Sequence, residues 1–179
     1  MNIPNFLSLL RIILVPVFII FLIQESYTNA LLTFVLAGLT DVFDGTLARM
    51  MNKQTKLGSF LDPMADKILL ASSFVTLSIL GLIPSWLTVI IISRDFIILF
   101  GIVILSMMSI TYEIKPAFVS KITTAMQIAT IFFALLYKAI THDISYNWII
   151  SLFWLTALFT VVSGLIYIIR GIKFINRAA

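Results

Sequence analysis

The sequence contains no cysteine, which excludes disulfide bonds and thiolate metal sites. Charged residues are also scarce: they make up 11% of the 179 residues, whereas soluble domains carry about one quarter. Hydrophobic residues make up 61%, and the mean hydropathy is +1.12, so water is not the solvent for most of the protein surface. The sequence also lacks repeats, low-complexity tracts and linkers. We therefore expect one membrane domain over residues 1–179, without a separate soluble module.

Long apolar runs dominate the sequence. A helix crosses a bilayer with about 20 apolar residues, and each of six runs is long enough to do so. The first run carries Arg11 and is not preceded by the basic segment of a signal peptide, so we expect it to be retained as a helix. The sequence thus predicts an all-α integral membrane protein with six transmembrane helices. The runs lie at residues 6–23, 30–48, 58–80, 84–108, 118–140 and 147–169.

Lysine and arginine residues indicate the orientation in the membrane. The net charge is +4, but the basic residues are scattered at the ends of apolar runs and form no patch with interleaved aromatic residues, so we expect no nucleic-acid partner. They gather near the amino end, in the second and fourth connections and in the tail, whereas the first and third connections have none. Because connections rich in lysine and arginine stay in the cytoplasm, we expect both termini there.

Four aspartates lie within or beside the second and third apolar runs, at Asp41, Asp44, Asp62 and Asp66. An unpaired carboxylate costs several kcal/mol in such a place, so a cation must neutralise them. The first two are spaced i, i+3 and the last two i, i+4, so each pair shares one face of its helix. The short basic segment between the runs predicts an antiparallel hairpin. The sequence midpoint between Asp44 and Asp62 is nearly the same as that between Asp41 and Asp66, so both pairs match across one turn. We therefore expect the two pairs to face each other.

Four converging carboxylates match the charge of two divalent cations. Hard oxygen ligands favour Mg²⁺ or Mn²⁺, and a site with two such ions suits displacement at phosphorus. Gly45, Ala48 and Gly58 flank the region and allow close approach of the backbone, while Arg49 is suited to hold a phosphate. The alternatives are a structural network of the aspartates or a cation transport site, and small residues also serve helix packing in membranes.

The segment DVFDGTLARMMNKQTKLGSFLDPMAD, residues 41–66, carries an Asp-x2-Asp-Gly-x2-Ala-Arg-x8-Gly-x3-Asp-x3-Asp pattern. This pattern resembles the signature of the CDP-alcohol phosphatidyltransferases, and every specified position is present. The likeness extends to NIPNFLSLLR, IISRD and KPAFVSKITTAMQ, so it covers most of the chain. The resemblance implies a bundle of six membrane helices around a cavity open to the cytoplasm. It also implies a bacterial cytoplasmic membrane with the active site on the cytoplasmic side.

Roles for the signature residues follow from the same resemblance. Asp41, Asp44 and Asp62 look like metal ligands, and Asp66 looks like a ligand that also acts as general base on the acceptor hydroxyl. The implied reaction moves the phosphatidyl group of CDP-diacylglycerol, a membrane lipid, onto a glycerol-type hydroxyl and releases CMP. Members of the family are often homodimers, so a homodimer is implied as well. The residues implied to bind the nucleotide are Asn5, Gly45, Ala48, Arg49 and Gly58.

Basic residues outside the signature are further candidates. Arg94 lies deep in the fourth run, and because adjacent helix residues point in different directions, we expect no pair with Asp95. Arg94 either holds an acceptor phosphate or is the structural partner of a carboxylate. Lys121 either does similar work or is a topology signal. Arg11 resembles a family residue near the nucleotide end, although snorkelling to the membrane surface explains it nearly as well.

The fourth run also bears on the acceptor. Bacterial phosphatidylglycerophosphate synthases, which use glycerol 3-phosphate, usually carry Arg-Glu there with a further arginine, whereas this chain reads SRDFIILFGIVILSMM, without a second basic residue. This run and KPAFVSKITTAMQ look more like the cardiolipin synthase branch, whose acceptor phosphatidylglycerol carries one charge. A missing cation weakens binding of a doubly charged phosphate more. Phosphatidylglycerol is therefore the expected acceptor, with glycerol 3-phosphate as the alternative if charge comes from Lys67, Lys115 or Lys121.

Overall fold

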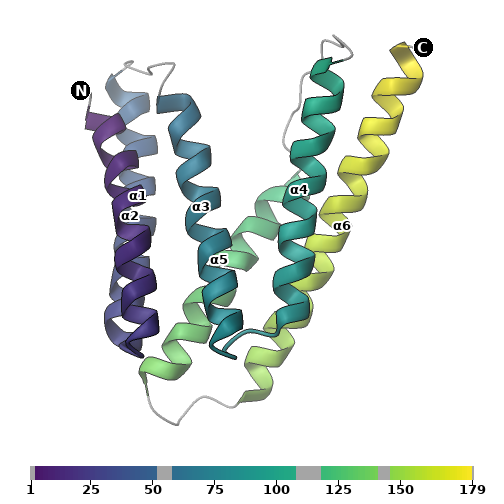
Figure 1. Cartoon of the computed structure of the whole chain (residues 1–179). Coiled ribbons are helices and arrows are strands. Elements are labelled where there is room, and N and C mark those ends of the chain that lie inside the picture. The colour runs from purple at the N-terminus through teal and green to yellow at the C-terminus, as the bar shows by residue number, and fades with distance from the viewer. Residues whose placement is uncertain (1–2, 52–57, 108–117, 141–145, 179) are drawn as a thin grey trace. The chain divides into compact units, whose positions relative to one another are not determined.

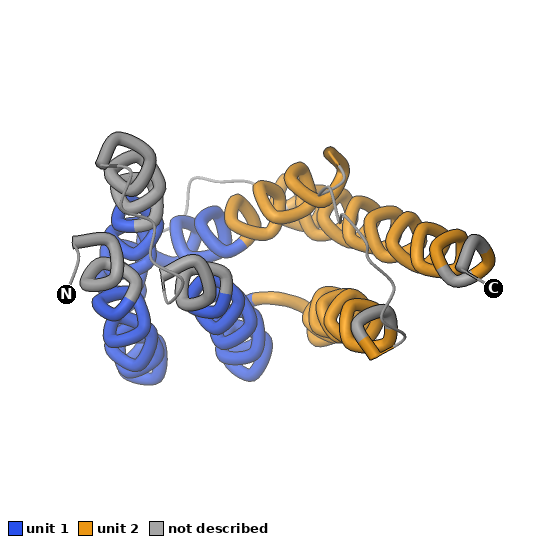
Figure 2. Tube along the Cα trace, turned by 90° about the horizontal axis from the view of Figure 1, so that it is seen from above, with its two compact units in different colours: residues 1–82, 131–144 blue, residues 83–130, 145–179 orange. Residues whose placement is uncertain are grey.

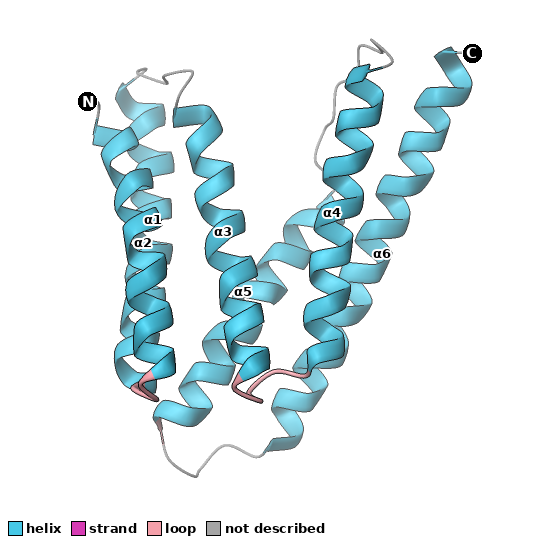
Figure 3. Cartoon of the chain, viewed as in Figure 1, coloured by secondary structure: helices cyan, strands magenta, loops and turns pink. Residues whose placement is uncertain are grey.

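The structure is a computed structural model that describes residues 3–51, 58–107, 118–140 and 146–178. Within these ranges, side chains are described for residues 9–40, 64–104, 107, 118–140, 147–174 and 176. The described residues form helices, with no strand among them (Figures 1 and 3). The helices are α1 (Ile3–Ile23), α2 (Tyr27–Met51), α3 (Gly58–Ile79), α4 (Ser85–Met107), α5 (Phe118–Ala139) and α6 (Tyr146–Ala178).

These elements confirm the predicted all-α architecture with six helices. The first five helices begin and end close to the limits of the predicted apolar runs. The reason is that a polar connection ends both the apolar run and the helix. The sixth helix ends at Ala178 rather than at residue 169. Beyond the apolar run, Arg170 and Lys173 continue the helix, because long straight side chains lose little rotamer freedom in a helix.

Three helices contain segments that are long and apolar enough to cross a membrane. Their described surfaces carry large apolar side chains, for example Phe100 of α4, 69% exposed, and Leu158 of α6, 60% exposed. Surfaces of this kind suit contact with lipid rather than with water. Shorter apolar stretches lie at Leu9–Ile23 in α1 and Tyr27–Thr40 in α2. The chain is therefore an integral membrane protein. Among the described residues, the segments that meet this limit are Ser85–Ile104, Phe118–Ala139 and Asn147–Phe174.

The chain divides into two compact units, which Figure 2 shows in different colours. Unit 1 comprises Met1–Leu82 and Ile131–Ile144. Unit 2 comprises Ile83–Thr130 and Ser145–Ala179. The helix α5 contributes its first part to unit 2 and its last part to unit 1.

Unit 1 is built around α1. This helix packs against both α2 and α3, and its buried side chains Val15, Phe18 and Leu22 lie along one face at helical spacing. The Phe18 ring packs on that of Phe34 from α2, with centroids 5.8 Å apart. A comparable contact of α2 with α3 is not seen in the described part of these helices. The predicted pairing of α2 with α3 concerns the ends that carry the aspartates, which lie largely outside the described residues, so it stays a prediction.

Similar turns end α1 and α3. The Ser26 backbone N–H donates to the Phe21 carbonyl oxygen at 2.9 Å, and the Leu82 N–H donates to that of Leu77 at 2.9 Å. This arrangement places one residue in the left-handed conformation, and glycine adopts it without steric cost. In the turn after α3 that residue is Gly81, with φ of 71°. In the turn after α1 it is Glu25, with φ of 56°, which costs roughly 1 kcal/mol.

Unit 2 joins α4 to α6 and both to the first part of α5. At one end, the rings of Trp86 and Trp154 lie 4.9 Å apart. Polar side chains connect α5 to α6: the Thr130 and Thr156 hydroxyls are 2.8 Å apart, and the Thr123 hydroxyl lies 3.0 Å from the Phe159 carbonyl oxygen. Hydrogen bonds of this kind hold membrane helices together where lipid offers no hydrophobic driving force. These bonds hold together the helices α5 and α6, which carry Ser120 and Ser163.

Candidate active site

Asp66 is the signature aspartate whose side chain the structure describes. It lies on α3 beside a buried stripe formed by Ala65, Leu69 and Ser73, and its side chain is 43% exposed. The position at the edge of the stripe follows from helix geometry, because a residue adjacent to a buried position points about 100° away from it. Asp66 is thus anchored in unit 1 and still partly accessible, as a group that reacts with a substrate must be.

Arg11 of α1 is the ion-pair partner of Asp66. Its Nη1 donates a hydrogen bond to Asp66 Oδ1, and its side chain is 0% exposed. Arg11 continues the buried face of α1 that Val15 and Phe18 define, which carries its side chain toward α3. A snorkelling side chain would extend its charged end to the membrane surface. That interpretation of Arg11 is therefore wrong, because the guanidinium is enclosed by protein and bonded to a carboxylate.

The other three aspartates of the signature are placed by their backbone only. Asp41 and Asp44 belong to α2, and Asp62 belongs to α3, as predicted. Asp62 and Asp66 are separated by about 6 Å along the helix axis, so one face of α3 carries both. The side chains of Asp41, Asp44 and Asp62 lie outside the described residues, as do those of the predicted nucleotide-binding set, Asn5, Gly45, Ala48, Arg49 and Gly58.

A metal site is not found among the described side chains. That search reached one of the four predicted ligands, Asp66, so convergence of the four carboxylates stays a prediction. The donor chemistry nevertheless fits the proposed ions. Carboxylate oxygens are the preferred ligands of Mg²⁺ and Mn²⁺, and Asp66 is accessible enough to offer one.

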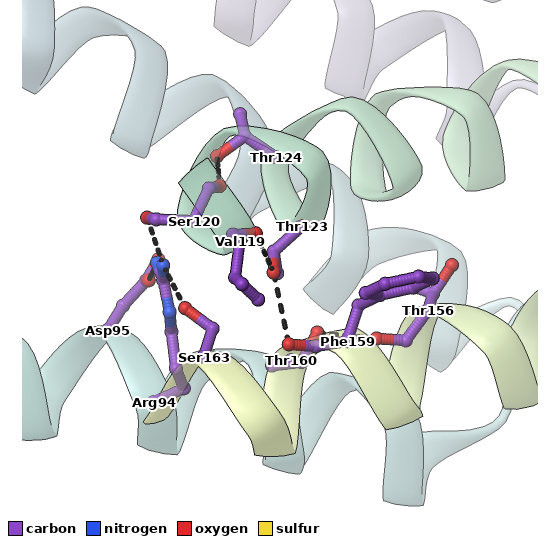
Figure 4. A network of polar contacts seen from close by, with 10 residues as sticks. All are labelled: Arg94, Asp95, Val119, Ser120, Thr123, Thr124, Thr156, Phe159, Thr160 and Ser163. Carbon is purple, nitrogen blue, oxygen red and sulfur yellow. Dashed lines mark hydrogen bonds and ion pairs between the residues drawn. The ribbon is translucent and has the colours of Figure 1, made fainter. Parts of the chain in front are cut away.

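A second charged group lies in unit 2, around Arg94 of α4 (Figure 4). Arg94 is 9% exposed. Its Nη2 donates to the Ser120 hydroxyl of α5 at 2.6 Å and to the Ser163 hydroxyl of α6 at 2.9 Å. The guanidinium carbon lies 5.8 Å from the centroid of the Tyr167 ring, within the range of a cation–π contact. Arg94 thus ties three helices of unit 2 together.

The predicted absence of an Arg94–Asp95 pair is wrong. Arg94 Nη1 donates to Asp95 Oδ1 at 2.7 Å. Adjacent Cβ atoms do point apart on a helix, but the long arginine side chain bends back far enough to reach its neighbour. Arg94 is thus the structural partner of a carboxylate, which is one of the two roles expected for it. Arg94 Nε is buried and has no hydrogen-bond partner among the described residues, so one donor of the fork is left for another acceptor.

The sequence reasoning missed Ser120, Ser163 and Tyr167 as partners of Arg94. A signal was present for the serines, because a hydroxyl in an apolar membrane helix tends to face a polar partner on another helix. In the structure, the arginine stem lies against Gly164, where a Cβ would lie 3.6 Å from Arg94 Cγ. The predicted acceptor residue Lys121 is exposed on α5.

Together, the helices and their charged groups define a class. The chain is an integral membrane protein that holds carboxylates and arginines inside its helices, where such residues are functional by default. Comparison with known proteins makes this class specific. The sequence model described as CDP-alcohol phosphatidyltransferase matches residues 1–163. The chain belongs to the CDP-alcohol phosphatidyltransferase family, which confirms the resemblance inferred from the signature.

Relatives of two kinds match the chain, cardiolipin synthases and glycerol-3-phosphate phosphatidyltransferases. It is 41% identical over 143 residues to a human cardiolipin synthase (CMP-forming), covering 71% of this chain and 48% of the relative. It is 33% identical to a probable cardiolipin synthase (CMP-forming) of Drosophila melanogaster, covering 95% of this chain and 58% of the relative. It is 32% identical to the CDP-diacylglycerol–glycerol-3-phosphate 3-phosphatidyltransferase of Bacillus subtilis, covering 91% of both chains. The chain thus spans about half the length of the cardiolipin synthases that it matches.

Proposed function

We propose that this protein transfers the phosphatidyl group of CDP-diacylglycerol to a glycerol-type hydroxyl and releases CMP, as a step in phospholipid synthesis. The observation that carries the proposal is Asp66: it completes the family signature, lies on α3 and keeps its side chain 43% exposed. Family membership over residues 1–163 supports the reaction class.

The proposed site uses the four aspartates together. Asp41, Asp44, Asp62 and Asp66 are the ligands for two Mg²⁺ or Mn²⁺ ions, which supply charge neutralisation at the pyrophosphate of the donor. Asn5, Gly45, Ala48, Arg49 and Gly58 form the nucleotide side of the site. Small residues permit close approach of the backbone to the nucleotide, and the Arg49 guanidinium is suited to a phosphate oxygen.

Asp66 acts as general base in this proposal. Its carboxylate accepts the proton of the acceptor hydroxyl, while the hydroxyl oxygen forms a bond to the phosphorus that bears diacylglycerol. The bond between that phosphorus and the bridging oxygen breaks, and CMP leaves with the bridging oxygen. Positioning and charge stabilisation account for most of the catalysis in phosphoryl transfer, so a base, acidic ligands and a phosphate-holding arginine are sufficient.

Phosphatidylglycerol is the proposed acceptor, which makes the protein a cardiolipin synthase, and glycerol 3-phosphate is the alternative. Arg94 of α4 and Lys121 of α5 are proposed to hold the acceptor phosphate. The ion pair with Asp95 supports the singly charged acceptor, because Asp95 already offsets the charge of Arg94. Relatives of both kinds match the chain, so this choice rests on Arg94 and its surroundings.

Orientation and assembly complete the proposal. The distribution of lysine and arginine supports a cytoplasmic location for both termini and for the active site, in a bacterial cytoplasmic membrane. Residues 1–179 are proposed to act as one membrane domain, because the family match covers both compact units. A homodimer is proposed from family resemblance.

The test is an assay of the purified protein in lipid nanodiscs. Labelled CDP-diacylglycerol is supplied with Mg²⁺ and either phosphatidylglycerol or glycerol 3-phosphate, and CMP release and lipid products are measured. We expect CMP release with phosphatidylglycerol and formation of cardiolipin. Efficient formation of phosphatidylglycerophosphate without cardiolipin would select the alternative acceptor. Ion flux without nucleotide dependence would replace the transferase with a transporter.

A further inference from the structure

The ion pair of Arg11 with Asp66 links a fully buried cation to the proposed general base. Arg11 is held within unit 1 by its place on the buried face of α1, and α1 packs directly on α3. Asp66, in contrast, lies at the edge of the buried stripe of α3 and is 43% exposed. One partner is therefore fixed by packing, while the other is accessible and depends on a contact for its orientation.

An accessible aspartate on a helix can occupy several rotamers. The Arg11 Nη1–H bond to Oδ1 selects one of them, because a charge-assisted hydrogen bond is stronger and more directional than a neutral one. The guanidinium itself cannot follow an alternative rotamer, since its stem lies among the packed side chains of α1. Breaking the ion pair would separate the buried Arg11 charge from the Asp66 carboxylate. The energetic cost of this separation keeps the two side chains together.

We propose that Arg11 is a positioning residue for catalysis: it holds the Asp66 carboxylate in the orientation from which that carboxylate accepts the acceptor's proton. The inference rests on the proposed function and adds a residue outside the family signature to the catalytic machinery. It also replaces the expectation of a contact to the nucleotide. Arg11 acts through Asp66, because its Nη1 donates a hydrogen bond to this carboxylate from within the packed face of α1.

Kinetics separate the two roles. A residue that binds the nucleotide contributes to substrate binding, so its removal raises KM for CDP-diacylglycerol. A residue that orients the base acts on the proton-transfer step, so its removal lowers kcat. For Arg11→Met, which keeps much of the side-chain length, we expect kcat to fall by roughly 10 to 100-fold, as for supporting residues that orient a reacting group. We expect KM for CDP-diacylglycerol to change by less than about threefold.

Two further variants test the dependence on Asp66. Arg11→Lys keeps a positive charge but lacks the planar fork, so we expect a kcat between those of Arg11→Met and the wild type. The double variant Arg11→Met with Asp66→Asn should retain the same residual turnover as Asp66→Asn alone, because a positioning residue has no effect once its target is removed. Losses that multiply in the double variant would overturn the proposal.

Phe18→Leu provides the matched control. Phe18 lies on the same face of α1, is fully buried and has no proposed contact to substrate. This variant reports how far a disturbance of α1 packing alone lowers turnover, and we expect kcat within about twofold of the wild type. A loss equal to that of Arg11→Met would assign the effect of Arg11 to packing and overturn the proposal. Binding of Mn²⁺, followed by its electron paramagnetic resonance signal, should change by less than about threefold in Arg11→Met, because the four ligands remain.

The outcomes distinguish this inference from the proposed function. Normal turnover of Asp66→Asn would refute the general base and, with it, the role of Arg11. Inactive Asp66→Asn together with a wild-type kcat for Arg11→Met would leave the transferase proposal intact and refute the inference alone. If Arg11→Met does not yield folded protein, Arg11→Lys decides: a reduced kcat with unchanged KM supports the positioning role, and a wild-type kcat overturns it.

Discussion

Replacement of Arg94 by methionine is expected to destabilise the protein through the charge that it leaves behind. Arg94 is 9% exposed and pairs with Asp95, whose side chain is 27% exposed. Removal of one partner of a buried ion pair costs roughly 3–5 kcal/mol, because the other charge is left uncompensated. The partial exposure of Asp95 places the expected loss near the lower end, at about 3 kcal/mol. The hydroxyls of Ser120 and Ser163 add little, since a serine in a helix can bond to its own backbone carbonyl oxygens.

The measurement is the free energy of unfolding in mixed micelles with increasing SDS. Tryptophan fluorescence provides the signal, because the ring pair of Trp86 and Trp154 belongs to the same unit as Arg94. Addition of Asp95→Asn to Arg94→Met removes the stranded charge and should recover part of the loss, to about 1–2 kcal/mol below the wild type. Lys121→Met is the control, because an exposed cation on α5 should change stability by less than about 0.5 kcal/mol.

Two results would refute this reasoning. A free energy of unfolding for Arg94→Met within about 0.5 kcal/mol of the wild-type value would show that the ion pair contributes nothing. A loss of unfolding free energy in the double variant equal to the sum of the losses in the two single variants would show that the two side chains do not interact.

Further predictions follow from the turns, the charges and the metal ligands. Excess chelator should abolish CMP release, and Mg²⁺ or Mn²⁺ should restore it, whereas undiminished turnover in chelator would exclude the two-metal proposal. A reporter fused after Ala179 should be cytoplasmic and one inserted at residue 26 should be external; the reverse locations would contradict the orientation drawn from lysine and arginine. Glu25→Gly should raise the free energy of unfolding by up to about 1 kcal/mol, because glycine removes the cost of the left-handed conformation, and a loss of stability would show that the Glu25 side chain contributes more than its strain costs.

The helices could be predicted because their cause is local. Each apolar run needs an internally bonded backbone in lipid, so the run itself sets the helix, and only α6 extends well past its run. The signature could be predicted for the same reason, since Asp62 and Asp66 are four residues apart on one helix. Packing between helices was harder. The pairing of α2 with α3 near the aspartates stays a prediction, and the packing of both helices on α1 has no signal in the sequence spacing.

Charge pairs were the least predictable features, because they depend on side chains from distant parts of the sequence. Arg11 and Asp66 are 55 residues apart, and a solitary arginine near a membrane-helix end gives no indication of its partner. The Arg94–Asp95 pair was missed for the opposite reason: the rule for adjacent helix residues describes Cβ directions and neglects the reach of arginine. Ser120 and Ser163 come from two other helices, which sequence spacing cannot bring together.

The most direct test of the central claim compares CMP release by the wild type and by Asp66→Asn, with CDP-diacylglycerol, phosphatidylglycerol and Mg²⁺. Glu25→Gln is the matched control, because it removes another carboxylate of unit 1 that lies in a turn outside the signature. We predict that Asp66→Asn lowers turnover by at least about 10²-fold, as expected for loss of a general base, while Glu25→Gln retains the wild-type rate. Wild-type turnover in Asp66→Asn would contradict the account.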